Sequence, residues 1–131
     1  METQDRPFAE FCIKLHHEFF ERFPDTTYRG LVSRALAMLL ERQQNFPGEA
    51  GAWAGAVVYA VGHGRYGVPG VLNAQLEEIF VAKMPVIRKR AAQIKQLLGD
   101  DAPLYIPDLA SLSGFVRQNF DITSDPAGTG Q

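Results

Sequence analysis

The side chains of this sequence that could carry out chemistry are three histidines, one cysteine and two pairs of adjacent carboxylates. His16 and His17 are neighbours, and adjacent side chains on a helix point about 100° apart, so the two rings cannot bind one metal ion by themselves. His63 stands alone. The sequence has no cysteine pair, no His-Glu helical motif and no aspartate-rich loop. We therefore expect no metal site and no cofactor.

A catalytic pair is the next possibility, since Cys12 and His16 are four residues apart and could face each other on a helix. Cys12 falls on an apolar stripe, however, where a thiol is inert. The adjacent carboxylates at 77–78 and 100–101 belong to faces that we expect to be solvated, with no cleft to separate their pKa values. We expect a protein that is not an enzyme; a deep pocket joining His16, His63 and a carboxylate would change that view.

The segment 63–70 contains three glycines and a proline and predicts a tight loop. It lacks the Walker spacing that ends in Gly-Lys-Ser/Thr. The element before it is predicted to be a helix, whereas a dinucleotide fingerprint needs a strand there. Nucleotide phosphate binding is therefore not indicated.

Composition sets the class of protein. The chain has 131 residues, of which 46% are hydrophobic, enough for one core, and its formal net charge is -2. This charge argues against coating nucleic acid by global electrostatics and leaves only a local basic face. Signal-peptide and membrane-span patterns are absent. We expect a cytoplasmic protein with one helical domain over residues 7–120 and a flexible tail at 121–131.

Apolar residues recur at three- and four-residue steps over 8–20 and predict an amphipathic helix that ends at Phe23-Pro24. Asp25-Thr26-Thr27 supplies cap chemistry for a second helix, which stops before Asn45. The segment 50–62 is small or apolar on every side. A helix there must be surrounded by the others, and its Ala and Gly residues allow close approach.

The second half of the chain has the layout of a helix-turn-helix at 73–98. Asn73 is a candidate cap for a short helix that ends at Phe80, a tight turn follows at 81–83, and a longer helix runs from Met84 to Leu98 with Gly99 as its stop. The apolar spacing predicts these inward residues on the two helices: Leu76, Ile79 and Phe80, then Ile87, Ala91, Ile94 and Leu98. After it, 100–107 is predicted to be extended and to lie back over the helices. A last short helix is predicted at 108–120.

The segments 53–62, 76–80 and 87–95 together resemble the cyclin-like repeat of transcription factor IIB. In that family a Trp- and Ala-rich central helix precedes a helix-turn-helix whose second helix meets DNA. The chain is also similar, over about 11–107, to a bacterial and archaeal family of unknown function built on the same segment. The resemblance implies a cyclin-like orthogonal bundle of about five or six helices.

The helix-turn-helix departs from the usual pattern at three positions. Glu77 stands where the first helix crosses the second and a small residue is usual, so its carboxylate needs a partner, for which Arg88 or Arg90 is a candidate. Val81 stands where glycine is usual, and a positive φ there would be strained. Lys83 replaces the usual Ser or Thr cap.

The resemblance and the basic second helix together favour a DNA-binding or transcription-associated module. Lys83, Arg88 and Lys89 are predicted to face the groove, with Arg90 and Lys95 nearer the phosphates. Exposed basic residues on a helix also occur without any function.

The alternative is a protein-interaction module, an adaptor or a small inhibitor. The acidic balance, the unusual turn and the aromatic C-terminal segment motivate it, together with the use of cyclin-like folds in that way elsewhere. It predicts an exposed apolar patch that includes Tyr66, Tyr105 or Phe115 and no affinity for duplex DNA.

Overall fold

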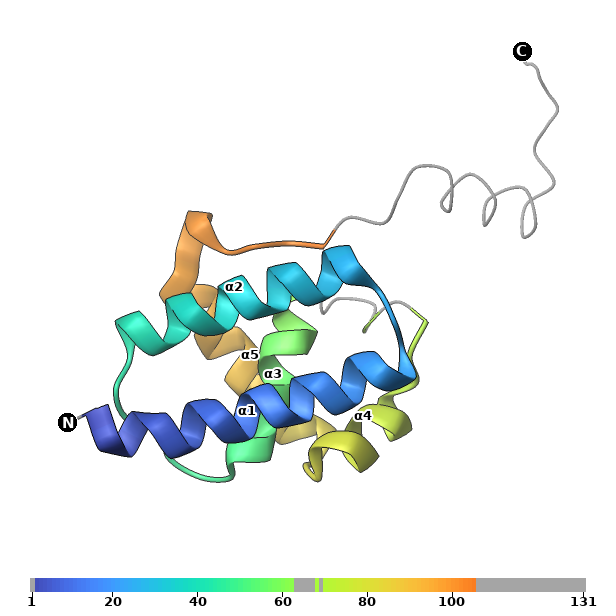
Figure 1. The fold of residues 1–131 in the computed structure, drawn as a ribbon, viewed down its shortest axis with the longest axis horizontal. Helices are drawn as coiled ribbons and strands as arrows, with labels where there is room; N and C mark the ends of the chain where they lie inside the picture. The colour runs from blue at the N-terminus through green and yellow to red at the C-terminus, as the bar shows by residue number, and fades with distance from the viewer. Residues whose placement is uncertain (1, 63–67, 69, 106–131) are drawn as a thin grey trace, which may run out of the picture.

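The computed structural model describes residues 2–62, 68 and 70–105 (Figure 1). Over these residues the chain is helical and has no strand, which confirms the all-α prediction. The elements, in chain order, are α1 (Glu2–Arg22), α2 (Thr26–Arg42), α3 (Ala50–Val61), α4 (Asn73–Phe80), α5 (Met84–Leu98) and the short 3-10 helix η2 (Gly99–Asp101).

α3 lies at the centre of the bundle, as its composition predicts. α1 and α2 run side by side in opposite directions, and α3 crosses behind them (Figure 1). α3 contacts all four other α-helices and packs most extensively against α5. Every residue from Gly51 to Val61 is buried, so this helix has no solvated face, and its position is set by the shapes of its neighbours.

Two glycines of α3 allow the end of α4 to approach its backbone. A Cβ atom at Gly51 would overlap the carbonyl oxygen of Phe80, and one at Gly55 would lie 3.1 Å from Phe80 Cγ. The predicted close approach of helices at the small residues of α3 is confirmed at these two positions.

The ends of α1 and α2 follow local rules. α1 begins at Glu2, earlier than the first periodic residue Phe8, and stops at Arg22, just before the Phe23-Pro24 pair. Asp25 caps α2, because its Oδ1 atom accepts a hydrogen bond of 3.0 Å from the backbone N–H of Tyr28. The cap predicted at this corner is therefore present.

The segment that follows η2 lies over the helices, as predicted, but the prediction that the extended stretch begins at residue 100 is wrong, because Asp100 and Asp101 belong to η2. The backbone N–H of Tyr105 donates to the carbonyl oxygen of Val61 at 2.8 Å. Its ring stacks on that of Tyr28 with 4.6 Å between centroids, and its hydroxyl donates to Asp25 Oδ2 at 2.6 Å. The predicted helix at 108–120 and the tail at 121–131 lie outside the described residues. None of the described helices is long and apolar enough to cross a bilayer.

Candidate nucleic-acid interface

α4, the turn at 81–83 and α5 form the helix-turn-helix layout, and both helices bury the sides that the apolar spacing predicts. The buried residues are Leu76, Ile79 and Phe80 on α4 and Met84, Ile87, Ala91, Ile94 and Leu98 on α5. The prediction of Asn73 as the cap of α4 is wrong by one residue. Leu72 occupies the cap position, and its backbone N–H donates to the side-chain oxygen Oε1 of Gln75 at 2.9 Å.

The turn carries the predicted strain. Val81 has φ 51° and ψ 53°, the left-handed conformation that disfavours a β-branched residue. Its side chain is 78% exposed and gains little from burial. The turn geometry therefore opposes the local preference of its own residue and must be imposed by the packing of α4 and α5.

The side chain of Glu77 bonds to the start of α5. The prediction that Arg88 or Arg90 is the partner of its carboxylate is therefore wrong. Its Oε2 atom accepts a hydrogen bond of 2.8 Å from the backbone N–H of Met84, in the first turn of α5. Lys83 occupies the cap position of α5 and makes no side-chain cap bond. A carboxylate from the preceding helix thus replaces the missing Ser or Thr, and a hydrogen bond to a charged acceptor is stronger than one to a neutral hydroxyl.

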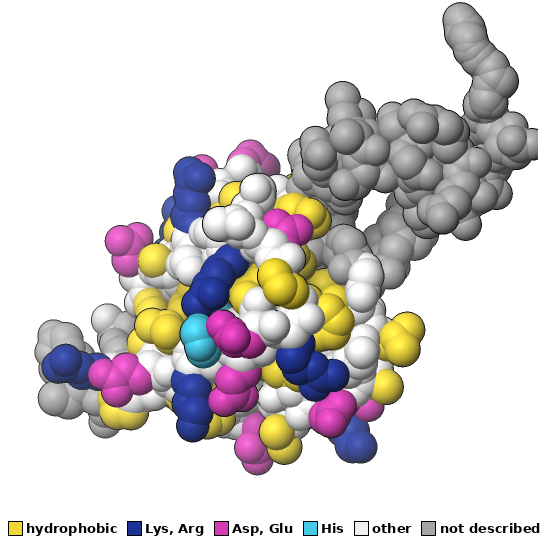
Figure 2. All heavy atoms as spheres, turned by 45° about the vertical axis from the view of Figure 1, so that its right-hand side comes forward, with side chains coloured by type: hydrophobic (Ala, Val, Ile, Leu, Met, Phe, Trp, Pro, Cys, Tyr) yellow, Lys and Arg dark blue, Asp and Glu magenta, His cyan; other side chains and the backbone are white. Residues whose placement is uncertain are grey.

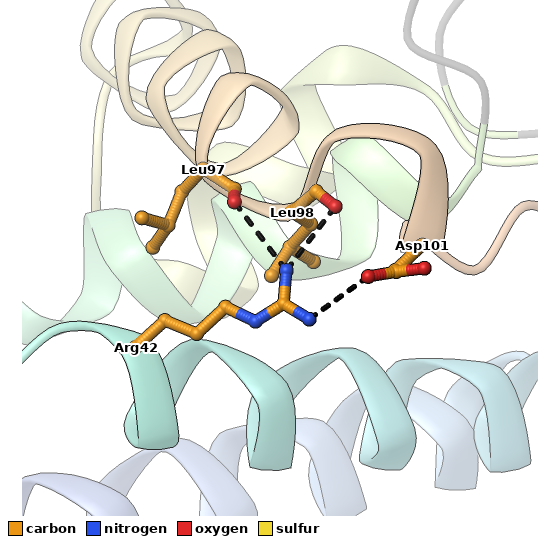
Figure 3. A network of polar contacts seen from close by, with 4 residues as sticks. All are labelled: Arg42, Leu97, Leu98 and Asp101. Carbon is orange, nitrogen blue, oxygen red and sulfur yellow. Dashed lines mark hydrogen bonds and ion pairs between the residues drawn. The ribbon is translucent and has the colours of Figure 1, made fainter.

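The opposite end of α5 is held by a side chain of α2 (Figure 3). Arg42 Nη1 donates to the carbonyl oxygen of Leu98 at 3.2 Å, and Arg42 Nη2 lies 3.0 Å from Asp101 Oδ2. Gly99 follows with φ 59°, in agreement with its prediction as the helix stop. Helical periodicity places Arg42 on the solvent side of its helix, and only the tertiary fold reveals this contact, which spans 56 residues of sequence.

Four of the five predicted nucleic-acid contacts are exposed, and none forms an ion pair with a residue that the structure describes. They are Lys83, Arg88, Lys89 and Lys95. The sequence between residues 79 and 99 contains no acidic residue. On the face in Figure 2, basic and acidic side chains are interspersed with apolar ones. Along the chain, α5 therefore has no acidic neighbour that compensates its positive charge, and the Glu77 carboxylate is bonded to its N-terminal end.

Arg90 differs from these four, because it is partly buried against the protein. Its Nη2 donates to the carbonyl oxygen of Pro47 at 2.9 Å, and its Nη1 donates to Gln93 Oε1 at 3.0 Å. The guanidinium also lies 4.8 Å from the centre of the Trp53 ring, an arrangement that favours a cation. The structure thus gives Arg90 internal partners in place of the open position beside phosphates that the sequence suggests.

The candidate catalytic groups are buried. Burial raises the pKa of the fully buried Cys12 thiol to about 12, so the thiol stays protonated. His16 is 6% exposed and donates from Nε2 to the carbonyl oxygen of Ala54 at 2.9 Å, and burial lowers its pKa to about 4. His16 lines a groove of about 250 Å³ between α1 and α2, and the described residues that line it include no carboxylate.

Of the three predicted partner-binding residues, the structure describes one. Tyr66 and Phe115 lie outside the described residues. Tyr105 is described, and its ring and hydroxyl are engaged with Tyr28 and Asp25. The large apolar side chains that the structure does expose are others: Phe11, Ile13, Leu72, Val81, Val86 and Leu104. Among them, Phe11 belongs by its spacing to the apolar stripe of α1, so the prediction that it points inward is wrong.

Comparison of the chain with models of protein families, with curated proteins and with solved structures finds no match. The likeness to the cyclin-like repeat stays a prediction, with which the helical bundle is compatible. The function of this chain must therefore be inferred from the helices described above.

Proposed function

We propose that the chain is a DNA-binding module that presents α5 to the major groove of a duplex. One observation carries the proposal: α5 and the turn before it expose four basic side chains, with no acidic residue between positions 79 and 99. Phosphate contacts supply a large share of the affinity of such modules, and they require basic side chains that have no acidic partner of their own.

The arrangement of these side chains fits a helix in a groove. Lys89 projects roughly opposite the buried stripe of α5, at about 100° per residue, and so points away from the body. Arg88 and Lys95 are two turns apart on one flank, where a phosphate backbone would pass. Lys83 stands beside the N-terminal end, the end of a recognition helix that enters the groove.

A fluorescence polarisation titration against random duplex DNA at about 50 and 200 mM salt tests the proposal. We expect binding that weakens steeply with salt, because each neutralised phosphate releases condensed counterions. The double variant Arg88→Ala with Lys89→Ala should reduce binding to background.

The control variant removes two positive charges from a different part of the protein surface. Lys14 and Arg34 are exposed on α1 and α2 and have no ion-pair partner among the described residues. Replacing both by alanine should leave most of the affinity. Equal loss in the two double variants would show that net charge alone attracts DNA, and undiminished affinity in the Arg88/Lys89 variant would reject the proposal.

A protein-interaction module is the second candidate, favoured by apolar side chains exposed along the helix-turn-helix: just before α4, in the turn and on α5. Leu72, Val81 and Val86 are 69%, 78% and 41% exposed. This function predicts no duplex binding above that of the Arg88/Lys89 double variant. It also predicts a protein partner whose binding is lost in Val81→Asp with Val86→Asp while the helical content of the chain is unchanged.

A further inference from the structure

We propose that α5 reads sequence through Lys89 and Gln93, that Gln93 selects adenine, and that Arg90 is the positioning residue that sets the direction of the Gln93 amide. This inference rests on the proposed function and deepens it from charge attraction to base recognition. Sequence patterns suggest only basic residues here, so Gln93 enters through the structure.

Lys89 and Gln93 share the outward side of α5. Both side chains are exposed, while Ile87, Ala91 and Ile94 are buried on the other side of the helix. Residues four apart on a helix have Cβ atoms about 5–6 Å apart. Base pairs in a duplex are stacked about 3.4 Å apart, so the two side chains reach base pairs that are one or two steps apart.

Arg90 is held in place by the body of the protein. Its guanidinium lies 4.8 Å from the centre of the Trp53 ring, and Nη2 donates to the Pro47 carbonyl oxygen at 2.9 Å. Trp53 is itself 1% exposed, and its Nε1 donates to the same carbonyl oxygen at 3.0 Å. The other terminal nitrogen, Nη1, is thereby aimed at Gln93, with which it forms a hydrogen bond of 3.0 Å.

This contact decides which way the Gln93 amide faces. A guanidinium has only donors, so the atom of Gln93 that lies against Arg90 must be the oxygen, and the NH2 group must point away. Without Arg90 the amide could turn over with little cost. With Arg90 in place, Gln93 offers an N–H donor and the second lone pair of its oxygen to the edge of a base in the major groove.

That pairing of donor and acceptor matches adenine. In the major groove adenine presents the N7 acceptor and the N6 amino donor, whereas guanine presents two acceptors, N7 and O6. Gln93 therefore favours adenine, and the ammonium group of Lys89, which only donates, favours guanine. The expected target is a duplex that carries a guanine and an adenine one or two base pairs apart.

Selection of the full chain against a pool of duplexes with a randomised central region tests this inference. We expect the wild type to enrich a guanine and an adenine at the stated spacing. Gln93→Ala should reduce the preference for adenine over guanine by about fivefold to a hundredfold. Lys95→Ala, a change on the flank of α5, should weaken binding evenly for all sequences.

Two variants separate positioning from structural support. Arg90→Lys keeps the charge but cannot bond Pro47 and Gln93 from one rigid plane, so it should lose most of the adenine preference, with a change of less than about twofold in affinity for the unselected pool. Gln93→Glu leaves Arg90 and Trp53 unchanged and replaces the amide donor of residue 93 by an acceptor. It should move the preference at that position from adenine to cytosine.

Each outcome bears on one of the proposals. Salt-sensitive binding with no enriched sequence overturns base reading and leaves the proposed function standing, while absence of binding overturns both. An adenine preference that survives Arg90→Lys overturns the positioning role. If Arg90→Lys does not fold, the Gln93→Glu selection still decides whether position 93 reads a base.

Discussion

α3 and α5 pack against each other more extensively than any other pair of helices in the described part of the chain, yet they are held by different means. α3 is buried on all sides, and its place depends on small residues that fit the end of α4. α5 buries one side, and both its ends are bonded to charged side chains of other helices, Glu77 and Arg42. α3 should therefore be sensitive to added volume, and α5 to lost end contacts.

The largest effect should come from added volume on α3. Gly51→Ala places a methyl group against the Phe80 carbonyl oxygen, which is backbone and cannot turn aside, so we expect a loss of at least about 3 kcal/mol in the free energy of unfolding. The control is Gly30→Ala on α2, where the same methyl meets nothing within 4 Å. It should raise stability by about 0.5–1 kcal/mol. Urea denaturation measures both, and equal stability of the two variants would contradict this account of α3.

The second largest effect on stability should come from acid, through His16, which is hydrogen-bonded to α3. Burial lowers the pKa of His16 from 6.5 to about 4, so between these values the unfolded chain binds more protons than the folded one. The stability that neutral His16 contributes is present in full above pH 6.5 and falls as the pH drops toward 4, by about 3 kcal/mol in total. Unfolding measured from pH 7 to pH 4 should show a shallower decline in His16→Gln, which keeps a donor for the Ala54 carbonyl oxygen. An identical decline would rule out His16 as the source.

A smaller effect is expected from the cap of α5. Glu77→Ala removes the acceptor for the Met84 N–H and should cost about 1–2 kcal/mol in thermal or urea unfolding. Glu78→Ala is the matched control, because Glu78 is exposed and forms only a 3.8 Å ion pair with Arg22, which contributes little. If the two alanine variants lose the same stability, the end contact is not what holds this helix.

The smallest effect is expected at Val81 in the turn, and there the substitution should increase the stability of the fold. Val81→Gly removes a β-branched side chain from a left-handed conformation and should raise the free energy of unfolding by about 1 kcal/mol. Val86→Gly, the same substitution inside α5, should lower it by about 0.5–1 kcal/mol. Chemical denaturation of the pair gives the signs, and a destabilised Val81→Gly would mean that the valine side chain supports the turn.

Local rules were enough to predict most of the helical framework. Apolar spacing predicts the inward residues of α4 and α5, and the strain at Val81 follows from its place in the helix-turn-helix pattern. The position of α3 follows from its composition, because a helix without polar residues can only lie inside. The cap at Asn73 is wrong by one residue, since a Gln75 side chain bonded to the Leu72 N–H starts the helix earlier.

The roles of the charged side chains could not be predicted in this way. Arg42 contacts Leu98, Arg90 contacts Pro47, and Tyr105 contacts Asp25, across 56, 43 and 80 residues of sequence. Such contacts depend on how whole helices are placed, and helical periodicity describes only which side of one helix faces the core. The orientation of the Gln93 side chain could not be predicted for the same reason. It follows from a hydrogen bond to Arg90, whose own position depends on the Trp53 ring.

The two end contacts of α5 also have an electrostatic consequence. A helix carries a macrodipole, with partial positive charge at its N-terminus and partial negative charge at its C-terminus. Here the carboxylate of Glu77 lies at the first end and the guanidinium of Arg42, which is also paired with Asp101, at the second, so the backbone groups at both ends have charged partners within the protein. A polyanion that approaches α5 is therefore attracted by its side chains alone, and the strength of that attraction is set residue by residue along the exposed side.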